Sequence, residues 1–317
     1  ALIRTLFLKR FESSAAAFEG SCYRLLQRLA AWAEKHAHSK HDQDRLKRWK
    51  IKHADLINYT KEHQLELWPQ EAEEDQAEEF LSEDILNQIE ELDPERFDLN
   101  GIMDDTLEDM NQLAEFLGLL RKVDPKKDDK IASLVRLLKK DKVLKQEKVI
   151  IFSEFADTAR YIEKSLKDAG IEGVQRIDGS STQKQRSEVI HRFAPYYNES
   201  SSAELAKKGK KEIRVLVATD ILAEGLNLQD ATRLINYDLH WNPVRLMQRI
   251  GRVDRRMDPE IEQRILKDHP DQKALRGKVQ YWNFLPPDDL DVLLRLFQRV
   301  ASKTLVISKT LGIEGRV

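Results

Sequence analysis

Short apolar runs alternate with amphipathic segments from residue 128 to residue 284, and this alternation constrains the fold more than any other feature. The run 149–152 is entirely apolar, as expected for a strand buried on both faces. Four further strands are predicted at 174–177, 213–218, 234–237 and 279–284. Strands that alternate with helices favour a parallel sheet with helices on both faces. The predicted class is therefore α/β, preceded by an all-helical N-terminal region.

The residues before this alternating region have a different character. Residues 1–37 carry apolar side chains at helical spacing, and 38–61 are basic and contain several histidines. Residues 62–115 hold twenty Asp and Glu against a single arginine, although apolar residues recur among them at helical spacing. We therefore predict a helical tail at 1–37, a charged helical insertion at 38–127 and an α/β domain at 128–317.

Composition limits the class of protein. The chain has 317 residues, which is enough for two compact units. Its net charge is -2. Cys22 is the only cysteine, which excludes an internal disulfide framework and a cysteine-based zinc site. No apolar run approaches a membrane span and the first residues do not form a signal peptide, so we expect no membrane partner and a cytoplasmic location, nucleoid-associated if bacterial. Because the chain begins with Ala1 in a helical pattern, we expect it to be part of a longer protein.

Polar clusters follow four of the predicted strands. They are 153–155, 178–182, 219–228 and 240–243. The carboxyl ends of parallel strands meet at one edge of a sheet, which is where ligands bind in open α/β folds. A lone Ser or Thr after a strand is usually a helix cap, but four clusters on one edge indicate a binding site. Residues 198–212 are polar and basic, and we expect a mobile loop there.

The last cluster leads into the sequence Q-x-x-G-R-x-x-R, which contains Gln248, Arg252 and Arg255. On one continuous helix, positions three and four apart share a face, so these three side chains are predicted to point the same way. Arginine presents a planar fork of donors that matches phosphate oxygens. Two such forks suit a site that neutralises charge on the terminal phosphate of a nucleotide. Asp254 is predicted to pair with a neighbouring arginine.

These motifs, taken in order, resemble those of the second RecA-like lobe of superfamily-two helicases, in the SWI/SNF-like branch of DNA translocases. Residues 149–155 resemble motif IV, 215–231 motif V and 248–255 motif VI. A glutamine at the head of motif VI separates this branch from the DEAD-box RNA helicases. Residues 8–18 are similar to the tail that ends the first lobe of bacterial members. The resemblance covers about two thirds of the chain and implies a RecA-like fold.

The resemblance also implies roles for individual residues. Arg252 and Arg255 would reach the phosphates of ATP as catalytic arginine fingers. Gln248 would support them or touch the nucleotide, and Gly225 would let the backbone approach it. The implied contacts to DNA phosphates are Ser153, Gly179, Ser180 and Thr219, which position the strand without reading its sequence.

The chain departs from the family pattern in one respect. It contains no G-x-x-x-x-G-K-[ST] loop and no Asp-Glu-x-His magnesium motif. We therefore expect ATP and Mg²⁺ to bind mainly to a first RecA-like lobe of the same parent chain. Expected partners are that lobe, double-stranded DNA and a protein that docks on the acidic residues 62–115. No metal site is predicted in this chain.

Two alternatives remain open at this stage. The chain could be a non-enzymatic RecA-like scaffold whose acidic segment docks a partner, or it could be the lobe of an RNA helicase. Paired arginines aimed at a cleft favour the enzyme over the scaffold, and Gln248 favours DNA over RNA.

Overall fold

A computed structural model of the chain describes residues 2–59, 86, 89–93, 95–122, 128–220, 227–240 and 242–285, with side chains from Leu8 onward. The described residues divide into two compact units. One unit contains residues 1–14 and 127–317, and the other contains residues 15–126.

A five-stranded parallel sheet forms the centre of the first unit. The strands are β1 (Val149–Phe152), β2 (Val174–Ile177), β3 (Val215–Ala218), β4 (Arg233–Asn236) and β5 (Gln280–Asn283). Their spatial order is β2-β3-β1-β4-β5, and every neighbouring pair is parallel. The predicted α/β class is therefore confirmed, with strand boundaries within two residues of those expected.

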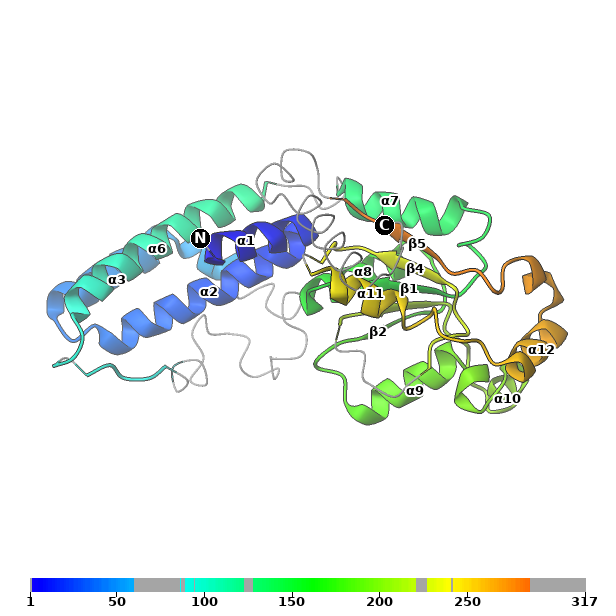
Figure 1. Cartoon of the computed structure of the whole chain (residues 1–317). Helices are drawn as coiled ribbons and strands as arrows, with labels where there is room; N and C mark the ends of the chain where they lie inside the picture. Colours follow the sequence, from blue (N-terminus) through cyan, green and yellow to red (C-terminus); the bar gives the residue numbers. More distant parts are fainter. Residues whose placement is uncertain are drawn as a thin grey trace, which may run out of the picture. The chain divides into compact units, whose positions relative to one another are not determined.

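Alternate residues of the central strands face opposite sides of the sheet, as the two-residue period of a strand requires. Val149 and Ile151 of β1 pack with residues of α7 (Asp129–Lys140) and α8 (Ala156–Asp168). Ile150 and Phe152 pack on the other side, with residues of α9 (Gln183–Phe193). Figure 1 shows α7 and α9 on opposite sides of the sheet. The strands thus supply both cores of the unit.

The remaining elements of this unit surround the sheet. They are η3 (Tyr196–Asn198), α10 (Ser202–Lys207), α11 (Pro243–Ile250), α12 (Pro259–Asp268) and η4 (Pro270–Ala274). Polar side chains cap several helix starts, which satisfies backbone N–H groups that lack a partner in the helix. Thr182 and Gln185 form a reciprocal capping box at the start of α9.

The segment predicted as a mobile loop is instead a structured part of the lobe. Tyr196 and Tyr197 both donate their backbone N–H groups to the buried carboxylate of Asp230, at 3.0 Å each. The Tyr196 hydroxyl donates to Asp268 at 2.8 Å, and α10 follows directly. Of the polar residues that suggested a loop, Ser200 and Ser201 are buried, and the lysines from Lys207 to Lys211 are exposed at and after the end of α10.

The first helix, α1 (Leu2–Ser13), belongs to the α/β unit. Lys9 and Glu12 are buried, and the Ser13 hydroxyl lies 2.7 Å from that of Thr158 on α8. The predicted helical tail at 1–37 is therefore divided at Ser14. Within α1, the polar side chains of Lys9, Glu12 and Ser13 find partners in the α/β unit.

The second unit is helical. Helix α2 (Ala15–His36) packs against α6 (Leu99–Leu120), and α3 (Lys40–Lys52) adds the buried side chain of Trp49. Most of the acidic stretch between α3 and α6 lies outside the described residues. Among the described helices of both units, none is long and apolar enough to cross a membrane.

Candidate functional site

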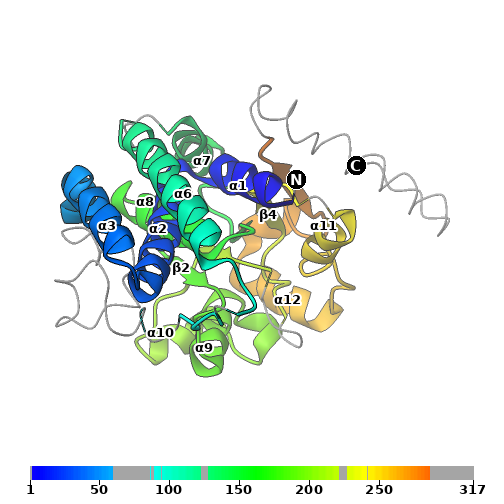
Figure 2. The same ribbon diagram turned by 90° about the vertical axis from the view of Figure 1, so that its left-hand side faces the viewer.

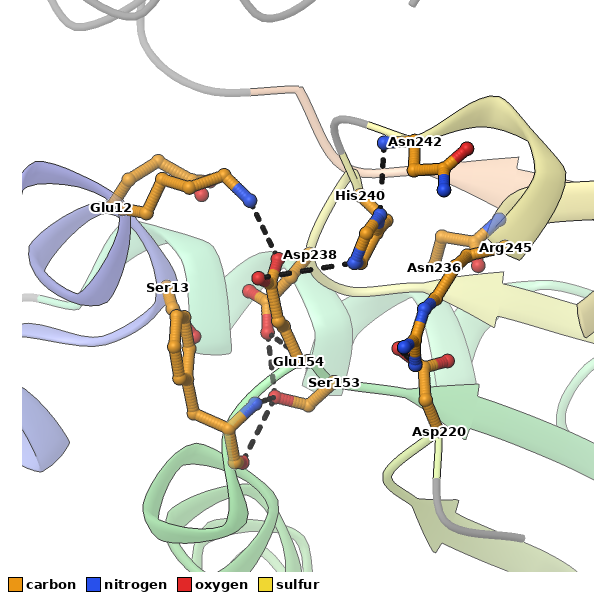
Figure 3. A network of polar contacts seen from close by, with 12 residues as sticks. Glu12, Ser13, Ser153, Glu154, Asp220, Asn236, Asp238, His240, Asn242 and Arg245 are labelled. Carbon is orange, nitrogen blue, oxygen red and sulfur yellow. Dashed lines mark hydrogen bonds and ion pairs between the residues drawn. The ribbon is translucent and has the colours of Figure 1, made fainter. Parts of the chain in front are cut away.

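The carboxyl ends of the parallel strands meet at one edge of the sheet. Residues 153–155 follow β1, 178–182 follow β2, 219–220 follow β3 and 237–240 follow β4. The predicted clustering of these segments follows from the parallel topology and is confirmed. Figure 3 shows Ser153, Asp238 and His240 close together at this edge.

Ser153 is held inside a buried network. It has no exposed surface, and its hydroxyl donates to Asp238 Oδ2 at 2.6 Å. The same hydroxyl accepts a hydrogen bond from the backbone N–H of Phe155 at 3.3 Å, and the Glu154 N–H donates to Asp238 Oδ2 at 2.9 Å. In this arrangement the Ser153 hydroxyl supports the end of β1 and is not presented to a DNA phosphate.

Ion pairs extend this network to α1. The Lys130 ammonium lies 2.7 Å from Glu12 Oε1 and 3.3 Å from Asp238 Oδ1. Lys9 pairs with Glu154 at 2.7 Å. Burial raises the pKa of the Glu12 carboxyl, and the charge of Lys130 opposes that shift. Lys9 and Glu12 of the first helix therefore act as partners of this edge of the sheet.

His240 lies beside the network in its neutral form. Its Nδ1 accepts a hydrogen bond from the backbone N–H of Asn242 at 2.9 Å, which requires an unprotonated Nδ1. Burial lowers the pKa of His240, against the opposing charge of Glu154. The geometry and the pKa shift therefore agree.

Arg249 is a structural residue that the sequence interpretation missed. It is 2% exposed and forms a two-pronged ion pair with Asp220, at 2.6 Å and 2.9 Å. Its Nη1 also donates to Asn236 Oδ1 at 3.2 Å and to the Asp238 carbonyl at 3.0 Å. The sequence spacing could have predicted this burial. Arg249 follows Leu246 by three residues, so both lie on the buried side of α11.

The helix that carries this motif is shorter than predicted. Helix α11 ends at Ile250, and Gly251 caps it with its N–H bonded to the Met247 carbonyl at 2.8 Å. Glycine is a poor helix former, and the chain turns so that Val253 enters the core with no exposed surface. The expectation that one continuous helix presents Gln248, Arg252 and Arg255 on a shared face is therefore wrong.

The turn nevertheless leaves these three side chains accessible. Gln248 and Arg255 are exposed, and Arg252 is half-buried. Arg255 donates to Asn227 Oδ1 and to the Gly251 carbonyl, both at 3.3 Å. Neither Arg252 nor Arg255 forms an ion pair with another described residue, and the same holds for Asp254, whose predicted pairing with an arginine is not seen.

Asn227 connects Arg255 to the segment that contains η3. Its backbone carbonyl accepts from Asn198 Nδ2 at 2.9 Å, and its own Nδ2 donates to the Tyr197 carbonyl at 3.3 Å. Asn227 is thus held on both sides, and its remaining amide oxygen faces the Arg255 guanidinium.

The turn after β2 is exposed at its tip and is held by hydrogen bonds to buried groups. Gly179 and Ser180 are exposed, whereas Asp178 has no exposed surface and pairs with Arg176. The Ser180 N–H and hydroxyl both donate to Asp178 Oδ1, at 3.0 Å and 2.5 Å. Arg186 donates to the Asp178 and Gly179 carbonyls at 3.2 Å and 3.3 Å. These bonds fix a turn whose tip faces solvent.

Thr219 and Gly225, two predicted site residues, follow β3, and only Thr219 is among the described residues. Thr219 is 4% exposed, and its buried hydroxyl has no hydrogen-bond partner among the residues that are described. Residues 221–226 follow it, so Gly225 lies outside the described residues. Within the described ranges, no group of three or more His, Cys, Asp or Glu side chains is arranged to hold a metal ion.

A five-stranded parallel sheet with helices on both faces, and with arginines presented at its carboxyl edge, defines a RecA-like lobe. Residues 129–257 match the helicase conserved C-terminal domain. These residues therefore form a helicase conserved C-terminal domain with a RecA-like fold, similar to the second lobe of superfamily-two helicases.

Three relatives illustrate the range of the match. The chain is 35% identical over 137 residues to "Uncharacterized ATP-dependent helicase YqhH" of Bacillus subtilis, covering 40% of this chain and 19% of the relative. It is 32% identical over 135 residues to "RNA polymerase-associated protein RapA" of Vibrio campbellii, covering 42% and 13%. It is 30% identical over 131 residues to "Probable ATP-dependent RNA helicase MJ0669" of Methanocaldococcus jannaschii, covering 41% and 30%. The matched region is thus a small part of each relative.

Proposed function

We propose that residues 128–285 act as the second lobe of an ATP-dependent, SWI/SNF-like motor that moves along double-stranded DNA. The supporting observation is the contrast within one motif. Arg249 is buried and bound by a carboxylate, whereas Arg252 and Arg255 have no ion pair with a described residue. Guanidinium groups left accessible in this way can serve an anion supplied from outside the lobe.

In this proposal ATP and Mg²⁺ are bound between this lobe and a first RecA-like lobe. Arg252 and Arg255 direct their guanidinium groups to the phosphates, and Gln248, exposed in the last turn of α11, supports them. Gly225 lets the backbone approach the nucleotide. The proposal assigns the Mg²⁺ ligands to the first lobe and to the phosphate oxygens of the nucleotide, since Mg²⁺ is usually held by one or two carboxylates together with substrate phosphates.

The DNA contacts are assigned to the exposed turn after β2. Gly179 and Ser180 are exposed at the tip of this turn, and the Ser180 N–H and hydroxyl reach a phosphate oxygen by exchanging their hydrogen bonds to Asp178 Oδ1. Such a contact positions a strand without reading its sequence. Thr219 joins them when its buried hydroxyl becomes accessible. Ser153 is reassigned from direct contact to support of the edge, because its hydroxyl is already bonded on both sides.

The direct test uses a protein in which this chain is joined to a first RecA-like lobe. Its ATP hydrolysis is measured with duplex DNA, single-stranded DNA and RNA. We expect the strongest stimulation by duplex DNA. Stimulation by RNA alone would support the RNA-helicase alternative, which the relative from Methanocaldococcus jannaschii favours. No hydrolysis under any condition would support the scaffold.

A protein partner for the acidic residues 62–115 remains part of the proposal. Within this region Phe97 is 48% exposed, and the exposed Asp98 follows it directly. Acidic residues repel the phosphate backbone, so this region should not bind DNA. Removing residues 62–92 should leave DNA affinity equal or higher, and a large loss of affinity with an intact fold would contradict that assignment.

A further inference from the structure

An open groove with a volume of about 1010 Å³ lies between α9 and the segment that contains α10. Figures 1 and 2 both show α9 and α10 next to each other at one end of the lobe. The groove is lined by residues 182–192 on one side and residues 198–210 on the other. The Asp230 carboxylate holds the backbone of Tyr196 and Tyr197, directly before the second side of the groove.

Basic side chains outnumber acidic ones along this groove. The charged lining residues are Lys184, Arg192, Lys208, Lys210, Glu188 and Glu199. Lys210 pairs with Glu188 at 3.1 Å, so these two charges compensate each other. Lys184 and Lys208 are exposed and form no ion pair with another described residue. The groove therefore has positive charge available to an external anion.

The groove also continues from the exposed turn after β2. Thr182 and Gln183 line its beginning, directly after Gly179 and Ser180. From Lys184 to Arg192 the helix rises about 12 Å, at about 1.5 Å per residue. Three to four base-pair steps of duplex DNA, at about 3.4 Å each, cover the same length. A phosphate backbone that touches the turn can thus extend along the groove.

We propose that this groove binds the phosphate backbone of double-stranded DNA and extends the contact made at Gly179 and Ser180. The proposal rests on the proposed function and names an additional surface for the same partner. Lys184 and Lys208 neutralise phosphates from opposite walls, and no group in the groove reads bases. Binding through it is independent of sequence and weakens with salt.

The test measures the affinity of this chain for duplex DNA of random sequence over a range of salt concentrations. Each lost phosphate contact reduces the slope of log affinity against log salt by about 0.9. The double substitution Lys184→Gln and Lys208→Gln should reduce the slope by about two. The matched control is Lys139→Gln with Lys140→Gln, two exposed residues of α7 on the opposite side of the sheet, and it should leave the slope unchanged.

A second variant predicts a change of opposite sign. Glu188→Gln removes the partner of Lys210, so its affinity for duplex DNA should rise several-fold. Equal slopes for the wild type and the lysine variant, or binding to duplex RNA but not duplex DNA, would overturn the groove assignment. The proposed function is tested separately, by stimulation of ATP hydrolysis in the unaltered two-lobe protein. The proposed function can therefore be correct even if the groove does not bind DNA.

Discussion

The polar residues at the carboxyl edge of the sheet fall into an inner and an outer group. The inner group, represented by Ser153, Asp238 and Arg249, is buried and bonded to partners within the lobe. The outer group, represented by Ser180, Arg252 and Arg255, lies at the surface with few such partners. The same residue types occur in both groups, so residue type alone does not identify a binding group.

The difference follows from the cost of burial. A buried charge or hydroxyl needs a hydrogen-bond partner, and each inner residue has one or more. An exposed arginine is hydrated and can exchange water for a phosphate. The inner group therefore fixes the geometry of the edge, and the outer group is available for ligands.

The largest expected effect concerns the outer arginines. In a protein that joins this chain to a first lobe, Arg252→Ala or Arg255→Ala should lower the rate of ATP hydrolysis by roughly a thousandfold or more if the two act as proposed, which is the range for arginine fingers. The fold and much of the ATP and DNA binding should remain, because neither guanidinium is part of the buried network. Steady-state kinetics and a thermal unfolding curve measure both quantities.

Two controls sharpen that result. Arg252→Lys should restore little activity, since an ammonium lacks the planar fork. Arg256→Ala alters an exposed arginine next to the pair and should change hydrolysis only slightly. Near-normal hydrolysis by both alanine variants would contradict the proposal that Arg252 and Arg255 act on ATP whereas Arg249 is structural.

The reverse outcome is expected for the inner arginine. Arg249→Ala leaves the Asp220 carboxylate without its two-pronged partner and should lower the free energy of unfolding by about 3 kcal/mol or more. Chemical denaturation of this chain measures the loss. If Arg249→Ala unfolds at the same denaturant concentration as the wild type, the buried pair does not support the edge as described.

Much of this arrangement can be predicted from the sequence. The apolar run 149–152 and its alternation with helices specify a parallel sheet, and the parallel sheet places four polar segments on one edge. These predictions succeed because strand burial and helix periodicity are local patterns.

The partners of individual polar residues could not be predicted in the same way. The pairing of Arg249 with Asp220 joins residues 29 positions apart, and that of Lys130 with Glu12 joins residues 118 apart. Only the folded chain brings such groups together. The end of α11 at Ile250 could have been inferred from Gly251, but the motif pattern favoured a longer helix.

A smaller effect should separate two serines that the sequence treats alike. Ser153→Ala removes a buried donor to Asp238 and should lower the free energy of unfolding by about 1 to 3 kcal/mol. Ser180→Ala removes an exposed hydroxyl that donates to Asp178, but Asp178 keeps its ion pair with Arg176, so the loss should be about 1 kcal/mol or less, with weaker DNA binding. Denaturation and DNA titration of both variants provide the comparison. Equal stability losses would place the two serines in the same group.

Removing the hydrogen bond between Asn227 and Arg255 should have a still smaller effect, on the rate of ATP hydrolysis. Asn227→Ala removes the 3.3 Å hydrogen bond to the Arg255 guanidinium and also the one that Asn227 Nδ2 donates to the Tyr197 carbonyl. The first bond is worth about 1 kcal/mol, so ATP hydrolysis in the two-lobe protein should fall about fivefold. The loss should appear in kcat and disappear when Arg255 is already alanine, because only the bond to Arg255 bears on hydrolysis. Fully additive losses in the double variant would show that Asn227 has a separate role.

The smallest effect concerns pH and the inner group. Burial lowers the pKa of His240 from its ordinary value of 6.5, so the folded chain favours the neutral ring. Its contribution to stability is therefore fully present above pH 6.5 and is lost as the pH falls from there through the lowered pKa, since the unfolded chain takes up the proton first. In His240→Gln this part of the pH dependence should be absent, so the stability difference between wild type and variant should shrink on acidification. Denaturation of both proteins at several pH values between about 7.5 and 5.5 measures it. Parallel profiles would mean that His240 is not held neutral, and the hydrogen bond from the Asn242 N–H to Nδ1 would then not describe the folded state.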